Sequence, residues 1–229
     1  MIHRRNILKT SIATFFGLSI GTSQAGLFSS PQCGTKCSYK SNRYSVGGPD
    51  KWGGPNTVDG HTHLQYYIWT RDRDLDTEVW DNEITNSYES WSKVTNLSFE
   101  RIDNGKNADI IMGASGRWRH GFGRRGDTLA WAQLPYHSDF DGQLLTMFDK
   151  AEKWTIDSEE RGILFRAVCA HEIGHLLGLD HSQHESALMY PYYHHNIETP
   201  QLIDDIPKIQ QLYGELDSVC VEEPVPPMP

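Results

Sequence analysis

Apolar and polar positions alternate along residues 63–69, where Leu64, Tyr66 and Ile68 take every second position. A period of two residues places these side chains on one face of an extended segment, so the stretch is predicted to be a strand with that face in the core. Shorter segments of the same kind predict strands at about 97–102, 109–113 and 129–134. The Gly- and Arg-rich stretch 114–127 is predicted to be a long surface loop.

A helical period replaces the alternation after the first predicted strand. Trp80, Ile84, Tyr88 and Trp91 recur three or four residues apart, which predicts a helix over about residues 77–93. These large side chains would form the apolar face that packs on the sheet.

Two more helices are predicted in the second half of the chain. An apolar face at 163–168 indicates a central helix, and Asp157 or Ser158 is predicted to cap it, with the two following glutamates in its first turn. A last helix is predicted over about residues 204–213.

The central helix carries the motif H-E-x-x-H-x-x-G-x-x-H, which begins at His171. His171 and His175 are four residues apart, so both imidazoles project from one face of a helix. Gly178 can adopt the left-handed conformation that ends a helix, and the returning chain brings His181 to the same place. Three imidazoles leave the fourth position of a zinc ion open, as in catalytic sites. Glu172, beside the first ligand, is predicted to act as the general base.

The N-terminus has the parts of an export signal, with a basic start, an apolar middle and a small-residue cleavage site after Ala25. Its Arg4-Arg5 pair resembles a twin-arginine signal, and an ordinary Sec signal is the alternative. Loss of the leader removes three basic residues, including Lys9, and changes the formal charge from −9 to −12. Such a surface argues against nucleic acid and anionic membranes as partners. No later stretch has the ~20 apolar residues of a membrane span, so we expect an exported protein, periplasmic or extracellular.

Several stretches resemble the matrixin family, the matrix-metalloproteinase-like branch of the metzincin zinc proteases. Ser182 directly follows the third histidine, as in matrixins. Met189 lies in a stretch that resembles the Met-turn beneath the zinc, and Pro191 stands where other metzincin branches carry a tyrosine. Further stretches resemble the family's core segments: 91–99, 108–110, 204–206 and 211–214.

The resemblance implies an α+β metzincin catalytic domain, in which three helices accompany a twisted five-stranded sheet that is mostly parallel with one antiparallel edge strand. Four segments are expected: an export signal at 1–25, a pro-segment-like extension at 26–43, the catalytic domain at 44–214 and a Pro-rich tail at 215–229. Substrate contacts are expected from two groups of residues: Leu129, Ala130, Trp131 and Ala132 on the edge strand, and Ala167, Pro191 and Tyr193 around a specificity pocket. The small Ala167 implies a deep pocket for a large apolar side chain.

Matrixins hold a second, structural zinc, and this chain departs from that pattern. The two strand positions that would supply ligands are Trp131 and Met147. His120 matches the first ligand, but one histidine does not make a site. We therefore expect no structural zinc, with Trp131 and Met147 in apolar packing instead.

A structural calcium site is matched in part. Asp149 and Glu152 stand at positions that help hold Ca²⁺ in the family, but residues 124–127 replace its Gly-rich loop. Oxygen ligands without enough partners bind Ca²⁺ poorly. Calcium binding and a solvated acidic turn both stay open.

Cys33 lies in a stretch that resembles the start of the family's latency motif, whose cysteine occupies the open zinc position in the zymogen. The residues after it depart from that motif. A competing hypothesis pairs Cys33 or Cys37 with Cys220 in a terminal disulfide, and the two can coexist because they use different cysteines. Cys169, within the central helix, is expected to be buried and free.

The motif and the resemblance predict a secreted, monomeric zinc endopeptidase that hydrolyses extended polypeptides. Three alternatives stay open: a catalytically silent domain that binds peptides, a structural zinc domain, and a hydrolase of a non-peptide amide. Glu172 argues against the first alternative, and the open fourth zinc position argues against the second.

Overall fold

The computed structural model describes residues 50–116 and 122–216. The expected export signal, the three cysteines outside the central helix and His120 lie outside these residues. Within them, no helix is long and apolar enough to cross a membrane.

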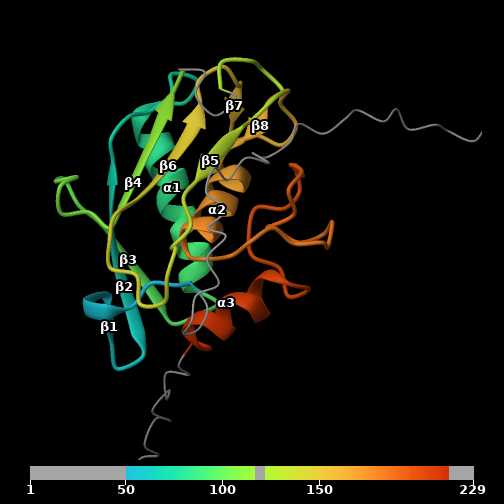
Figure 1. Cartoon of the computed structure of the whole chain (residues 1–229). Coiled ribbons are helices and arrows are strands. Elements are labelled where there is room, and N and C mark those ends of the chain that lie inside the picture. Colours follow the sequence, from blue (N-terminus) through green and yellow to red (C-terminus); the bar gives the residue numbers. More distant parts are fainter. Residues whose placement is uncertain (1–49, 117–121, 217–229) are drawn as a thin grey trace, which may run out of the picture.

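Five strands form a twisted mixed sheet in the spatial order β3-β2-β4-β6-β5 (Figure 1). Their bounds are β2 His61–Ile68, β3 Leu97–Arg101, β4 Ile110–Ser115, β5 Ala130–Ala132 and β6 Leu144–Asp149. The first four in spatial order run parallel, and β5 pairs antiparallel to β6 at one edge. The expected five-stranded mixed sheet is therefore confirmed.

Four short elements accompany this sheet, and one of them, β1, extends it. The 3-10 helix η1 (Gly54–Asn56) leads into β1 (Thr57–Val58), which pairs antiparallel with the start of β2. A separate pair consists of β7 (Trp154–Thr155) and β8 (Ile163–Leu164).

The strand β6 was not predicted from the sequence. Four of its six residues are apolar and five are buried, without the alternation that marks a half-buried strand. Strands that are covered on both faces read as continuous apolar runs, so this run of apolar residues was the available signal.

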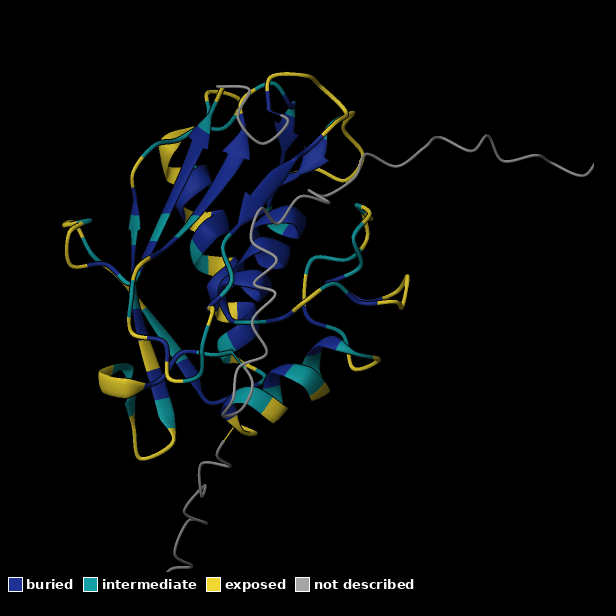
Figure 2. Cartoon of the chain, viewed as in Figure 1, coloured by how far each residue is buried: buried dark blue, intermediate teal, exposed yellow. Residues whose placement is uncertain are grey.

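The three expected helices are present: α1 at Thr77–Ser92, α2 at Phe165–Leu176 and α3 at Asp205–Tyr213. The predicted apolar face of α1 is almost fully buried between the sheet and α2 (Figure 2). Trp80 stacks on Phe165 with ring centroids 3.8 Å apart, and Trp91 Nε1 donates to the Ala170 carbonyl of α2 at 2.9 Å. The two helices are thus locked against one face of the sheet.

The predicted start of α2 is wrong. The helix begins at Phe165, because residues 163–164 remain extended and pair in parallel with β7. The Asp157 carboxylate accepts the Glu159 amide two residues on, which makes a turn rather than a helix cap. Pairing to a neighbouring strand thus displaces the helix start by about two turns.

The last helix closes the C-terminal end of α2. Tyr213 of α3 donates its hydroxyl to the Leu177 carbonyl at 2.9 Å, and Trp52 Nε1 donates to the Leu176 carbonyl at 2.7 Å. These carbonyls belong to the last turn of α2, where no helical partner exists. Cys169, in the middle of α2, is free and fully buried, as expected.

Candidate active site

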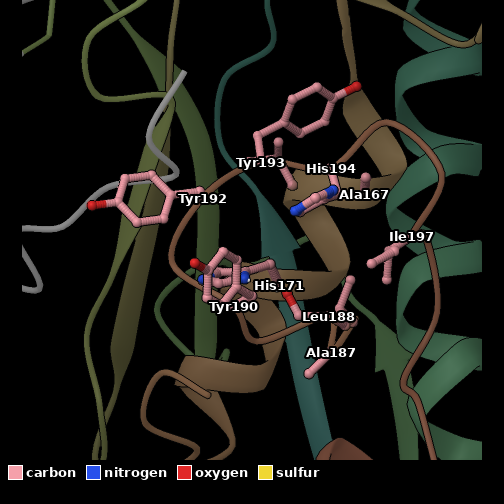
Figure 3. Close-up of a pocket in the computed structure, with 10 residues that line it drawn as sticks. Ala167, His171, Ala187, Leu188, Tyr190, Tyr192, Tyr193, His194 and Ile197 are labelled. Atoms are coloured by element: carbon pink, nitrogen blue, oxygen red, sulfur yellow. Dashed lines mark hydrogen bonds between the residues drawn. The ribbon is translucent and has the colours of Figure 1, made fainter. Parts of the chain in front are cut away.

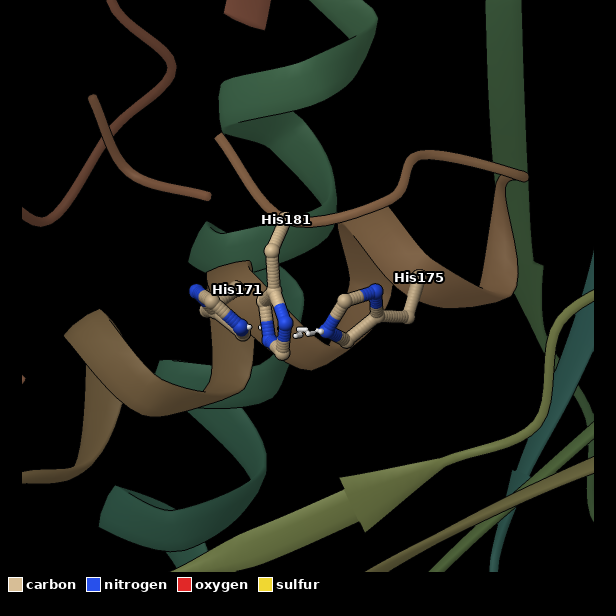
Figure 4. A group of neighbouring side chains, drawn as sticks. All are labelled: His171, His175 and His181. Atoms are coloured by element: carbon tan, nitrogen blue, oxygen red, sulfur yellow. Dashed lines mark hydrogen bonds between the residues drawn. The ribbon is translucent and has the colours of Figure 1, made fainter. Parts of the chain in front are cut away.

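Three imidazoles meet at the C-terminal end of α2 (Figure 4). His171 Nε2 lies 3.1 Å from His175 Nε2, which lies 3.2 Å from His181 Nε2. Nitrogens bound to one tetrahedral zinc at about 2.0–2.1 Å stand about 3.3–3.4 Å apart. Within the described residues, these three are the one group of three or more His, Cys, Asp or Glu side chains arranged to hold a metal ion.

The protonation of the first two rings is set by backbone carbonyls. His171 Nδ1 donates to Leu188 O and His175 Nδ1 donates to Leu179 O, both at 2.7 Å. Each Nε2 of a neutral ring therefore presents a lone pair toward the other. Two facing lone pairs repel each other unless a cation lies between them, so this donor set fits a zinc ion.

Burial keeps these rings neutral. Desolvation, with a further effect from His181, lowers the pKa of His171 to about 3. Desolvation also lowers the pKa of His175 well below its usual value and lowers that of His181. Neutral imidazole is the form that ligates metals, so the site is prepared for an ion rather than for protons.

Gly178 produces the turn that brings the third histidine back. Its φ is +99°, in the left-handed region that glycine adopts without strain, as the sequence predicted. A Cβ at this position would lie 2.5 Å from the Asp50 carbonyl oxygen, so the close approach of another segment also requires glycine.

Met189 packs on α2 at Gly174, which lies between His171 and His175 in the helix. A Cβ at Gly174 would lie 2.3 Å from Met189 Sδ and 2.9 Å from Trp91 Cζ2. Glycine costs about 1 kcal/mol in a helix interior, and here it allows the methionine turn to approach α2 directly. The Ser182 amide donates to Met189 O at 2.8 Å, which links this turn to the segment after His181.

Asp205 supports the same turn and was not identified from the sequence as a site residue. Its fully buried carboxylate accepts the amides of Leu188 at 2.6 Å, Met189 at 3.1 Å and Gln201 at 2.9 Å. Burial raises the pKa of Asp205, although these hydrogen bonds act in the opposite direction. The residue stands at the start of α3, far from the motif in sequence. Its contact with the methionine turn arises from tertiary packing, so the sequence pattern did not predict it.

A narrow pocket opens beside His171 (Figure 3). Ala167 and Tyr193 are among the residues that line it, and Pro191 is not. The Tyr193 hydroxyl accepts the Leu164 amide at 2.9 Å, which ties this wall to the start of α2. The space that water can enter is about 20 Å³. This volume is too small for the large apolar side chain that the small Ala167 led us to expect.

The predicted substrate strand and the candidate base are both beside these histidines. β5 is the edge strand next to α2 (Figure 1). Leu129, Ala130 and Ala132 are buried. Glu172 is 1% exposed and follows His171 in α2.

Trp131 and Met147 point to the other face of the sheet. They are cross-strand partners in the β5–β6 register and form a small apolar cluster with Phe122. The apolar packing of these two residues is as the sequence predicted, and Phe122 is an additional member. Indole, thioether and phenyl groups offer no ligand that zinc prefers.

The two acidic residues matched to a calcium site contact the loop before β5. Asp149 accepts the Gly123 amide at 2.7 Å and the Ala151 amide at 2.9 Å, and Glu152 accepts the Gly126 amide at 2.6 Å. Desolvation raises the pKa of both carboxyls, with backbone hydrogen bonds acting in the opposite direction. Both carboxylates therefore bind the backbone of this loop.

Comparison with known proteins places this arrangement in a family. The sequence profile of the matrixins matches residues 57–214. Human matrix metalloproteinase-26 is 40% identical over 161 residues, which cover 68% of this chain and 59% of that protein. Stromelysin-1 of Equus caballus is 39% identical over 161 residues, covering 67% of this chain and 32% of that protein. Karilysin of Tannerella forsythia is 38% identical over 158 residues, covering 67% and 32%.

The chain thus spans between about a third and three fifths of the length of these relatives. The matched region contains the helices α1, α2 and α3, every strand of the sheet and all three histidines of the motif. On the agreement of this profile with the motif, the methionine turn and the sheet, the chain belongs to the matrixin family.

Proposed function

We propose that this protein is a secreted zinc-dependent endopeptidase. The observation that carries the proposal is the convergence of His171, His175 and His181 on one point. The Nε2 atom of His175 lies 3.1 Å from that of His171 and 3.2 Å from that of His181. A site of three protein ligands that leaves the fourth zinc position open is the arrangement of catalytic zinc.

Each residue has a distinct role in this mechanism. The three histidines hold the zinc, which supplies Lewis acidity to polarise the scissile carbonyl. Glu172 takes a proton from the attacking water and passes it to the departing amine nitrogen. Met189, Leu188 and Asp205 keep the first histidine in place, because the carbonyl that orients its ring belongs to the turn that Asp205 holds.

The substrate is an extended polypeptide that adds to the free edge of the sheet. Leu129, Ala130, Trp131 and Ala132 provide the edge strand, whose backbone can pair with a peptide. The side chain after the scissile bond enters the pocket at Ala167 and Tyr193, beside Pro191. Because the open space is small, a large apolar side chain requires the 192–197 segment to shift outward.

The chain's organisation follows from the same proposal. Residues 1–25 direct export, 26–43 form a pro-segment-like extension, 44–214 form the catalytic domain and 215–229 a tail. One zinc is bound, because Trp131, Met147 and Phe122 occupy the sheet face where ligands would be needed for another. Cys33 remains a candidate latent-state ligand of that zinc, and the protein acts as a monomer in the periplasm or outside the cell.

The deciding experiment exposes the protein without its leader to a proteome-derived peptide library, with and without a zinc chelator. We expect cleavage that the chelator abolishes, and mass spectrometry then reads the preferred residue after the cut.

Glu172→Ala separates catalysis from binding. We expect it to retain one equivalent of zinc and to lose about 10²–10⁴-fold in turnover, the usual contribution of a general acid–base group. Glu89→Ala, which alters an exposed glutamate of α1, is the matched control and should keep full activity. A wild-type protein that binds zinc and peptides but cleaves none would instead identify a silent peptide-binding domain.

A further inference from the structure

Two imidazoles lie on the outer face of β2, away from the candidate zinc site. His61 and His63 are two residues apart, so they share a face, and the buried Thr62 and Leu64 point to the opposite one. His61 Nε2 lies 2.7 Å from Ser98 Oγ, and His63 Nδ1 lies 2.9 Å from the same oxygen. One nitrogen of each ring therefore faces a single point, the hydroxyl of a serine on β3.

The other nitrogen of His61 has a partner that determines its tautomer. His61 Nδ1 lies 2.9 Å from Asn96 Oδ1, while the Asn96 amide nitrogen donates to Gly60 O at 3.3 Å. Because Asn96 Oδ1 is an acceptor, the proton of a neutral His61 is on Nδ1. Its Nε2 therefore presents a lone pair toward Ser98.

The second nitrogen of His63 also faces an oxygen acceptor, here the carboxylate of Glu100. His63 Nε2 lies 3.5 Å from Glu100 Oε2, and Glu100 also accepts the side-chain amide of Gln65 at 2.8 Å. A neutral His63 with its proton toward this carboxylate presents the Nδ1 lone pair toward Ser98. Histidine oriented by an oxygen partner on one nitrogen, with the other nitrogen free to ligate, is the usual arrangement at protein metal sites.

With both rings in these tautomers, the serine hydroxyl can satisfy only one of them. Its single hydrogen goes to one of the two nitrogen lone pairs, and its oxygen faces the other. A cation at this point would be attracted by both nitrogens at once. Beside the rings lies a hollow of about 280 Å³ that has room for the waters that complete a coordination shell. Its lining is of mixed character, with Pro55 and Val58 beside Asn56, His61, His63, Gln65 and Asp109.

We propose that His61 and His63 form a second, surface site for a divalent transition-metal ion. Imidazole nitrogen selects Cu²⁺, Zn²⁺ or Ni²⁺ over Mg²⁺ and Ca²⁺, and Cu²⁺ binds most tightly of the three. His61 Nε2 and His63 Nδ1 are the ligands, Asn96 and Glu100 orient the rings, and water supplies the remaining positions. With two protein ligands, the site is weaker than the three-histidine centre and responds to the free metal concentration.

The test loads the full chain with one equivalent of zinc and titrates it with Cu²⁺. Calorimetry and electron paramagnetic resonance should report one further ion with a two-imidazole nitrogen signature, while elemental analysis shows that the first zinc is retained. His61→Ala and His63→Ala should each weaken this binding at least about tenfold. His195→Ala, which removes an exposed histidine elsewhere, is the matched control and should leave it unchanged.

Two further variants test the geometry itself. Ser98→Ala removes the competing hydroxyl and should preserve or strengthen copper binding, whereas Glu100→Gln should weaken it. Copper binding that persists when both histidines are replaced, or that is absent from the wild-type chain, overturns the proposal. No peptidase activity enters these readouts, so their failure would leave the proposed function standing.

Discussion

Two clusters of three side chains lie on opposite sides of the sheet, and they differ in the chemistry of the groups that meet. At the end of α2, His171, His175 and His181 turn ring nitrogens toward one another. On the outer face of β5 and β6, Phe122, Trp131 and Met147 meet as apolar groups.

The difference lies in what each cluster needs. The facing lone pairs of His171 and His175 repel each other until a cation binds, so the arrangement of the first cluster depends on metal. The second cluster gains stability from burial alone, at about 25 cal/mol per Å² of apolar surface removed from water. A chelator should therefore disturb the histidine cluster and leave the packing of the apolar cluster unchanged.

The largest effect is expected from His175→Ala. The variant should lose its zinc, and peptide cleavage should fall more than about 10³-fold, because loss of a single preorganised donor already costs about 10²–10³. Elemental analysis and peptide cleavage provide the measurements. His184→Ala, an exposed histidine nearby, should keep both zinc and activity; equal losses in the two variants would contradict the assigned ligands.

Trp131→Ala tests the apolar cluster. Trp131 is 8% exposed, and its truncation should lower the free energy of unfolding by about 3–5 kcal/mol, as for other buried aromatic residues. Denaturant titration should show this loss while the zinc content stays at one equivalent. Trp69→Ala, at a tryptophan 57% exposed, is the control, with an expected change within about 0.5 kcal/mol. A lower zinc content in Trp131→Ala than in the wild-type protein would contradict the independence of the two clusters.

The smallest effect concerns pH and the loop next to the apolar cluster. Burial raises the pKa of Glu152 above its ordinary value of 4.5, so between these values the native state holds a proton that the unfolded state has released. Wild-type protein should gain stability relative to Glu152→Gln as the pH falls through this window, with the gain complete below about 4.5. Unfolding curves at several pH values measure it, and a relative loss on acidification would reverse the assigned direction.

Much of the fold could be predicted because its signals are local. The spacing of Trp80, Ile84, Tyr88 and Trp91 identified α1, and the alternation in residues 63–69 identified β2. The start of α2 and the strand β6 were missed for the opposite reason. Both depend on pairing with another strand, which the local pattern around Asp157 or within residues 144–149 does not report.

In the candidate site, too, some features follow from local sequence and others from tertiary packing. The sequence by itself determined the convergence of His171, His175 and His181, because helical spacing and the turn at Gly178 act within eleven residues. Tertiary structure decided how the His171 ring is oriented and what lies beside it. The Leu188 carbonyl, the Asp205 carboxylate beneath it and the narrow pocket at Tyr193 come from separate segments. Their contacts arise from packing against α2, and packing partners far apart in the chain leave no periodic signal in the sequence.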